Sequence, residues 1–377
     1  MIKKIILIAV NALLFIAFII CLSLTSSIKS SLRSQQAAET WRGQSGERFA
    51  QLSVFFPDTA AFTSESVLLF RRSLDTALVN ASIDTPQGRI LYTDAWSAEY
   101  TVSLVDSRGF PVSANATAIG GDFFLFHPYF LKSGSYLSPN DVMHDRVILD
   151  EELAWRLFGS SNLEGFEVLI NARPFQVAGV ISRESDTAST KAYTAGAGLF
   201  MTLEALAELT ETEINITCYE IVMPNPITGF ALKTMTDQIP STDVKIIENS
   251  ARYSMSNSFE IIRSFGERSM RTYPITYPYW ENAARYTEDW LALILILSFL
   301  FITFPAICGL VYLIKLIRLG VKQGKKIFTK QVEKHDKRQY EKYLLKNTDN
   351  LDKDFELYDL DNIINEVKTE QGDGSSA

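Results

Sequence analysis

The chain has 377 residues, of which 47% are hydrophobic, and a formal net charge of −8 at pH 7. The charge is divided by region. Residues 315–346 contain eleven Lys and Arg against three acids, residues 347–377 contain two against nine, and residues 27–314 have a net charge of −11. This acidic central region argues against the binding of nucleic acid or of anionic lipid by that part of the chain.

The first predicted element is an apolar run over residues 5–24, in which only Asn11 and Ser23 are polar. At 1.5 Å per residue, a helix of this length crosses a hydrocarbon core of about 30 Å. Lys3 and Lys4 precede the run, so the positive-inside rule places the N-terminus in the cytoplasm. The alternative is a secretory signal peptide. We favour an uncleaved anchor, because the run exceeds the roughly 7 to 15 residues of a signal core and no Ala-x-Ala site follows.

Strand and helix patterns then alternate along the chain. Residues 50–56 alternate in polarity as a strand does, residues 67–78 repeat apolar positions at the spacing of an amphipathic helix, and residues 100–104 alternate again. A turn is expected at residues 106–109. Interleaved strands and helices of this kind predict an α+β domain built from split β-α-β units.

The clearest local pattern begins with a β-branched strand at residues 146–149. Asp150 is placed to cap a helix whose first turn contains Glu151 and Glu152, near the positive end of the helix dipole. Gly159 occupies the position where a left-handed cap is expected. The helix has an apolar face that needs a sheet to cover it, made of Leu153, Ala154, Leu157 and Phe158.

Further signals surround this helix. Two strand-like segments, residues 168–170 and 175–181, are separated by turn residues and predict a hairpin. The whole run from 118 to 181 resembles the MacB-like periplasmic core domain family. In that family the recurring order of elements is a turn followed by an Asp-Phe-Phe helix, a Gly-rich loop, a strand, a Leu-Ala-x-x-Leu-Phe-Gly helix and a hairpin that ends in Gly-Val. The matching stretches are Gly120-Gly121-Asp122-Phe123-Phe124, Ser133-Gly134-Ser135, Leu153-Ala154-Trp155-Arg156-Leu157-Phe158-Gly159 and Gly179-Val180.

The resemblance implies an extracytoplasmic core of two α+β subdomains, one resembling the porter fold and one inserted in it. We place the insertion between residues 183 and 243. Family members are usually subunits of ABC-type systems, in which a cytoplasmic ATPase drives the membrane helices, and they usually have four spans. Here only two are expected, so the resemblance leaves direct contact with the ATPase open.

An aromatic segment precedes the second apolar run, and Pro274 and Pro278 prevent a regular helix there. An aromatic belt at the outer membrane interface is the plain interpretation, and a stiff collar that transmits movement is the alternative. The segment contains Tyr273, Tyr277, Tyr279, Trp280, Tyr286 and Trp290.

The second apolar run covers residues 291–314, has no charge, and is followed by a basic segment. Both termini are therefore expected in the cytoplasm of a bacterium, with the plasma membrane crossed twice. The expected division is a first transmembrane helix at 1–26, an extracytoplasmic domain at 27–288, a second transmembrane helix at 289–317 and a cytoplasmic tail at 318–377.

No residue pattern indicates catalysis, a cofactor or a metal. The histidines, His127, His144 and His335, have no ligand at a metal-binding spacing, and we expect His127 to be packed or at an edge. Glu151 and Glu152 are adjacent, so they face different directions on a helix. Residues 184–187 read as a solvated loop. Cys218 stands alone outside the apolar runs, so no internal disulfide can brace the domain.

Two functions remain open. The first is a permease-like subunit that couples a cytoplasmic ATPase to the outer domain, without catalysis of its own. Two spans cannot enclose a solute path, so a second permease or a homo-oligomer is implied beside the ATPase and the lipid bilayer. The second is an extracytoplasmic ligand sensor or scaffold. The tail has no recognisable output module, which favours coupling; it offers only a short apolar face between residues 351 and 367, within its acidic part.

Overall fold

The computed structural model describes residues 2–83, 90–106, 108–138, 141–193, 198–239, 243–265 and 275–370, with side chains up to residue 345. Residues 15–301 form one compact unit, and residues 1–14 together with 302–377 form another. The first unit contains the α+β domain and the adjoining parts of two long helices. The described residues of the second unit are all helical.

The two apolar runs lie within α1 (Ile2–Ser31) and α10 (Tyr279–Glu370). Both helices are long and apolar enough to cross a membrane, judged by length and composition. α10 begins directly after Pro278, as the proline in that segment predicted. Between α1 and the first strand lie the short helices η1 (Arg33–Gln35) and α2 (Ala37–Arg42).

Within the described residues, ten strands form one mixed sheet with the order β10-β1-β9-β2-β3-β8-β5-β7-β4, and β6 pairs with β2 and β7. The strands are β1 (Phe49–Phe55), β2 (Thr93–Val105), β3 (Pro111–Gly121), β4 (Phe130–Gly134), β5 (Arg146–Asp150), β6 (Glu167–Ile170), β7 (Arg173–Ser182), β8 (Gly198–Thr202), β9 (Cys218–Pro224) and β10 (Lys245–Glu248). The predicted strands at 50–56, 100–104, 146–149, 168–170 and 175–181 are confirmed.

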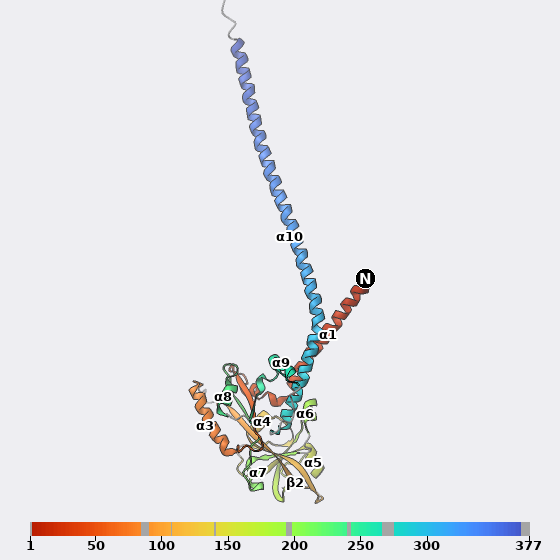
Figure 1. Ribbon diagram of the computed structural model, residues 1–377, viewed down its shortest axis with the longest axis vertical. Coiled ribbons are helices and arrows are strands. Elements are labelled where there is room, and N and C mark those ends of the chain that lie inside the picture. Colours follow the sequence, from red (N-terminus) through yellow and green to blue (C-terminus); the bar gives the residue numbers. More distant parts are fainter. Residues whose placement is uncertain are drawn as a thin grey trace, which may run out of the picture. The chain divides into compact units, whose positions relative to one another are not determined.

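Four of these strands form the predicted split β-α-β arrangement. β1, α3 (Ser64–Asn80) and β2 make one unit, and β9, α8 (Phe230–Gln238) and β10 make the other. Their order is β10-β1-β9-β2 and every neighbouring pair is antiparallel. Two interlocked β-α-β units with this order constitute a ferredoxin-like sheet. Figure 1 shows α3 and α8 lying together on this part of the domain.

The second subdomain is inserted between β2 and β9, across residues 106–217, and contains β3 to β8. The expectation of an insertion between 183 and 243 is therefore wrong. β8 pairs with β3 and β5 inside the insertion, whereas β9 returns to pair with β1 and β2. Both are short apolar segments, and only their long-range pairing distinguishes the subdomains to which they belong.

The inserted subdomain contains the helices α4 (Phe123–Phe126), α5 (Glu151–Phe158), α6 (Thr187–Ala192) and α7 (Leu203–Thr210). The predicted caps of α5 are confirmed: the Leu153 amide donates to Asp150 Oδ1 at 2.7 Å, and Gly159 is left-handed with φ 69°. Gly120 and Gly121, predicted as a turn, are the last residues of β3, and Gly121 is left-handed with φ 64° shortly before α4. A Cβ atom on Gly120 would lie 2.2 Å from Trp96 Nε1, so the indole ring of β2 covers a surface that only glycine provides.

The two faces of the sheet differ. One face packs a large apolar core against α3, α5, α7 and α8. The other face packs against α2, α4 and the start of α10, and it buries polar side chains among aromatic ones. β1 shows the contrast: Leu52 and Val54 face the first core, while Gln51 and Ser53 are buried on the second. The first turns of α10 thus lie on the more polar face.

Candidate functional site

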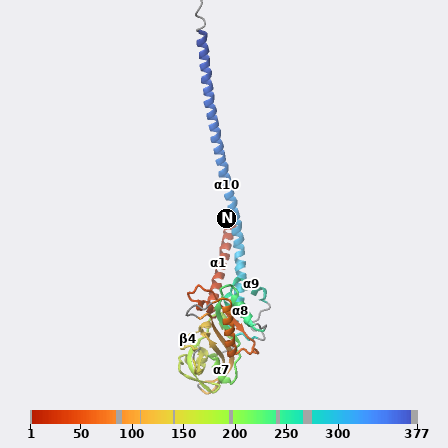
Figure 2. The same ribbon diagram turned by 90° about the vertical axis from the view of Figure 1, so that its left-hand side faces the viewer.

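The first turns of α10, residues 279–290, contact both subdomains before the helix enters its apolar run. We call this region the joint. It consists of these turns, the end of α1 with η1, the loop after β10, and α6. The loop contains η2 (Asn249–Ala251) and leads to α9 (Met255–Arg263). Figure 2 shows the joint region from the side, with α9 beside α10.

Buried charges attach α10 to the ferredoxin-like subdomain. Arg252, directly after η2, donates from Nη1 and Nη2 to the two carboxylate oxygens of Glu281, at 2.6 and 2.7 Å. Its Nε donates to Glu288 Oε1 at 2.6 Å. Arg285 Nε reaches Glu281 Oε1 at 2.8 Å. Arg252 is 3% exposed and Glu281 1%, so this bidentate pair is removed from water and depends on its partners for solvation.

The pKa shifts of Arg252 and Glu281 both favour the charged forms of these side chains. Burial acts to lower the pKa of Arg252, but the charges of Glu281 and Glu288 raise it well above its ordinary value. Burial likewise acts to raise the pKa of Glu281, but the attraction of Arg252 and Arg285 leaves it below its ordinary value. The charged forms are therefore mutually stabilised, as is required of ions kept out of water.

The same loop also holds the end of α1. Arg252 Nη1 donates to Gln35 Oε1 at 3.5 Å, and Lys29 Nζ donates to the carbonyl oxygen of Tyr253 at 2.7 Å. Leu32 is buried in a small cluster with Ala283 and Ala284 of α10. The ends of both long helices therefore meet at one loop of the ferredoxin-like subdomain.

Aromatic side chains attach α10 to the inserted subdomain. The rings of Tyr279 and Tyr193 stack with centroids 4.0 Å apart, and the Tyr279 hydroxyl donates to Glu184 Oε2 at 3.1 Å. The same hydroxyl also pairs with the hydroxyl of Tyr129. Burial raises the pKa of both Tyr129 and Tyr279 well above the ordinary value, so the hydroxyls remain protonated and able to donate.

Trp280 enters the polar face of the sheet beside a buried contact between a histidine and a glutamate. Its ring lies 4.5 Å from His127 and 5.8 Å from Phe123, centroid to centroid. His127 Nε2 contacts Glu220 Oε2 at 2.5 Å, and Ser53 donates to Glu220 Oε1 at 3.0 Å. His127 belongs to the insertion and Glu220 to β9, so this pair joins the two subdomains under the tryptophan.

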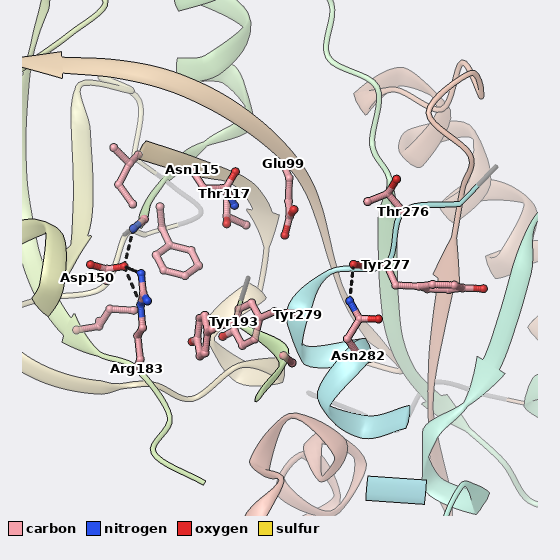
Figure 3. Close-up of a pocket in the computed structure, with 15 residues that line it drawn as sticks. Glu99, Asn115, Thr117, Asp150, Arg183, Tyr193, Thr276, Tyr277, Tyr279 and Asn282 are labelled. Carbon is pink, nitrogen blue, oxygen red and sulfur yellow. Dashed lines mark hydrogen bonds and ion pairs between the residues drawn. The ribbon is translucent and has the colours of Figure 1, made fainter. Parts of the chain in front are cut away.

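A small cavity of about 100 Å³ lies between β3, β8, α6 and α10. Figure 3 shows Asp150 and Arg183 paired on one side of it, with the rings of Tyr193 and Tyr279 beside them. Asp150 Oδ2 accepts from Arg183 Nε at 2.9 Å and from the Gly198 amide at 2.5 Å. The residue predicted only as a helix cap therefore also fixes the start of β8.

The structure tests the sequence predictions for the histidines and for the paired glutamates. His127 is buried, as expected. Glu151 and Glu152 do diverge, since Glu151 lies 3.6 Å from Lys132 and Glu152 lies 3.2 Å from Arg183. The described residues contain no group of three or more His, Cys, Asp or Glu able to hold a metal ion.

The prediction of a solvated loop at residues 184–187 is wrong for two of its residues. Glu184 is half-buried and accepts from Tyr193 and Tyr279, and Asp186 caps α6 through the amides of Ala188 and Ser189. The partners come from α6 and α10, which the loop sequence does not reveal.

The prediction of an aromatic belt at the membrane interface is wrong for the residues nearest the domain. Tyr277 and Trp280 are buried in its second core, and Tyr279 is half-buried between subdomains. Trp290 is exposed. Tyr273 and Pro274 lie outside the described residues, as do the side chains of the apolar face in the tail. The alternative collar agrees better with this packing.

Sequence reasoning missed the charge cluster. Glu281, Arg285 and Glu288 recur at spacings of four and three, which places them on one face of α10 immediately before an apolar run. Three charges on one face there could have indicated a buried partner. Arg252 could not have been identified, because nothing local marks it.

Comparison with known proteins decides the family. The model of the MacB-like periplasmic core domain matches residues 8–253. The chain belongs to this family. The macrolide export ATP-binding/permease protein MacB of Aggregatibacter actinomycetemcomitans is 36% identical over 83 residues, which cover 22% of the chain but only 13% of that protein.

Two solved structures resemble the MacB-like domain. The periplasmic region of MacB from Actinobacillus actinomycetemcomitans is 18% identical, with a TM-score of 0.39, covering 58% of this chain and 93% of that one. The extracellular domain of the noncanonic ABC-type transporter YknZ from Gram-positive bacteria is 12% identical, with a TM-score of 0.35, covering 52% and 99%. At these values neither adds to the family assignment. MacB-like domains are extracytoplasmic parts of permease-like membrane proteins of ABC-type transporters.

Replacement of Arg252 by Met should destabilise the MacB-like domain by about 3–5 kcal/mol, because Glu281 and Glu288 would remain buried without their shared cation. Thermal or denaturant unfolding of the full chain would measure the loss. Arg156→Met, at an exposed position of α5, is the matched control and should change stability by less than about 0.5 kcal/mol. Equal effects of the two substitutions would contradict the assignment of Arg252.

Acidification should weaken the same cluster. The folded-state pKa of Glu281 is lower than its ordinary value of 4.5, so its contribution to stability is complete above that value and is lost as the pH falls through the folded-state pKa. The melting temperature should therefore fall more steeply below pH 4.5 in the natural chain than in Glu281→Gln, which starts lower at neutral pH. Parallel curves would exclude this role for Glu281.

Proposed function

We propose that the chain is a permease-like membrane subunit of a bacterial ABC-type transport or envelope-remodelling complex. It couples a cytoplasmic ATPase to the extracytoplasmic domain and is not itself catalytic. Residues 1–26 and 289–317 cross the plasma membrane in this proposal. Residues 27–288 lie outside, and residues 318–377 lie in the cytoplasm.

The observation that supports coupling is the double attachment of α10. A helix apolar enough to cross a membrane is joined to one subdomain through Arg252 and Glu281, and to the other through Tyr279 and its partners. Packed interfaces of this kind rearrange between discrete states and do not deform continuously. A shift or rotation of the first turns of α10 therefore has to move both subdomains or break a buried ion pair.

A non-catalytic role agrees with how the ionisable groups are used. Asp150 accepts the amides of Leu153 and Gly198 together with the guanidinium of Arg183, and Glu281 is held by two arginines. The cavity beside Asp150 and Tyr279, at about 100 Å³, is smaller than the roughly 300–1,000 Å³ of typical ligand sites, whereas a larger cavity of about 670 Å³ lies beside Arg252 and Glu288.

The remaining partners follow from topology. Two spans cannot enclose a polar path, so a second permease or another copy of the chain is required beside the ATPase. The only glycine-rich segment with lysines, residues 320–326, lacks the spacing and the Ser or Thr of a phosphate loop and lies within α10. ATP hydrolysis is therefore assigned to another protein. The basic residues at 315–346 suit anionic headgroups at the cytoplasmic surface.

The orientation is tested by cysteine labelling in a background without Cys21, Cys218 and Cys308. Arg156→Cys should react with a membrane-impermeant maleimide in intact spheroplasts, because the exposed face of α5 lies outside the cell. Lys337→Cys, equally exposed on a helix, should react only after permeabilisation. Labelling of position 337 alone in intact spheroplasts would invert the topology and defeat the proposal.

The partner is tested by photo-crosslinking in the native cell. Benzoylphenylalanine at position 340, which is exposed in the basic segment, should give an adduct with an ABC-type ATPase. The same probe at position 155, exposed on α5, should give none. Absence of an ATPase adduct throughout the segment from 318 to 345 would remove the support for direct coupling.

Coupling itself is tested in the isolated complex with Tyr279→Phe. This substitution keeps the ring stacked on Tyr193 but removes the hydroxyl shared with Glu184 and Tyr129. The complex should assemble and hydrolyse ATP, while the ATP-dependent change in the outer domain, followed by a fluorophore on Arg156→Cys, should fall several-fold. An unchanged response would mean that the tyrosine contact does not transmit movement.

A further inference from the structure

An apolar groove lies between α9 and the beginning of the apolar run of α10, with a volume of about 470 Å³. α9 and the residues after it provide Ile262 and Phe265, and α10 provides Tyr286, Trp290, Leu293 and Ile296. The α10 residues recur at spacings of four and three, so they form one stripe along the helix. The groove is separate from the joint cavity and from the buried charge cluster.

α9 exposes apolar side chains that a water-facing helix would bury. Met255 is 63% exposed and Phe259 is 48% exposed, and together with Ile262 they occupy positions i, i+4 and i+7 of one face. Ile261 and Ser258 face inward and are buried. A short helix with an exposed apolar stripe and polar neighbours is typical of helices that lie in a membrane interface.

The position of α9 along α10 supports this setting. The rings of Phe259 and Phe299 are 5.9 Å apart, so α9 lies beside the apolar run and not above it. Leu293 and Ile296, which line the groove, are 45% and 48% exposed, and Leu300, which lies beyond the groove on α10, is 66% exposed. In both ribbon views α9 lies against this part of α10 (Figure 1, Figure 2). A membrane around α10 would cover this surface with lipid.

We propose that the groove binds one acyl chain of a phospholipid from the outer leaflet, with α9 lying at the boundary between headgroups and acyl chains. The inference depends on the membrane location of α10 and not on coupling to an ATPase. A bound acyl chain would fill the groove between the interfacial helix and the membrane helix.

The chemistry of the lining favours an acyl chain over a protein loop. A loop would bring amide and carbonyl groups that need hydrogen-bond partners away from water. Among the residues that line the groove, polar side-chain atoms come from Tyr286, Asp289 and Trp290, and the other five residues are apolar. An acyl chain makes no such demand, and its burial among aromatic and aliphatic side chains is favourable. A transmembrane helix of a partner remains the competing occupant, and the experiment distinguishes it.

The test uses the full chain, purified in mild detergent with added phosphatidylethanolamine and examined by native mass spectrometry. The natural chain should retain one phospholipid. Leu293→Trp, which narrows the groove, should reduce the bound fraction at least ten-fold. Leu300→Trp, on the same helix but outside the groove, is the matched control and should retain the lipid. Circular dichroism of both variants should match that of the natural chain.

A photoactivatable phospholipid with a diazirine in its acyl chain provides an independent measurement in vesicles, where detergent cannot remove a lipid. Adducts should concentrate on residues 255–265 and 286–296 and should decrease in Leu293→Trp. Adducts confined to residues 300–314, or equal labelling in Leu293→Trp and Leu300→Trp, would overturn the proposal. A second protein chain on the groove in place of lipid, detected as a specific dimer mass lost in Leu293→Trp, would also overturn it.

Discussion

The buried ion cluster around Arg252 is the constraint on which the arrangement of the domain and its helices depends. A guanidinium and two carboxylates removed from water are tolerable only when each meets its partners with good geometry. Arg252 meets both oxygens of Glu281 and one of Glu288, and no displaced register of α10 would keep all three contacts. The cluster therefore specifies where α10 leaves the domain and how it is rotated.

The two faces of the sheet serve different purposes. The face against α3, α5, α7 and α8 is an apolar core of the ordinary kind, which supplies stability without directional preference. The face beneath α10 buries Gln51, Ser53, Glu220 and His127, each with a specific partner. Directional contacts favour one docking arrangement over others. The first turns of α10 pack on the polar face of the sheet, where the directional contacts are concentrated.

The joint and the apolar groove lie on overlapping stretches of α10, which share residues 286–290. Residues 279–290 are held by side chains of both subdomains, and residues 286–296 line a surface suited to lipid. A movement of α10 that starts in the membrane would therefore first displace the groove and α9, and would then displace the charge cluster. At this joint the ionisable groups Asp150, Arg252 and Glu281 form a helix cap and buried ion pairs.

The sequence by itself determined the local structure. The caps of α5, the hairpin of β6 and β7 and the helical apolar runs were all predictable, because each depends on residues a few positions apart. Only the tertiary structure decided which strands belong to the insertion, that Trp280 is buried, and that Arg252 pairs with residues 29 and 36 positions away. Those outcomes depend on pairing between distant segments. A short apolar strand or a single arginine has no local feature that distinguishes one distant partner from another.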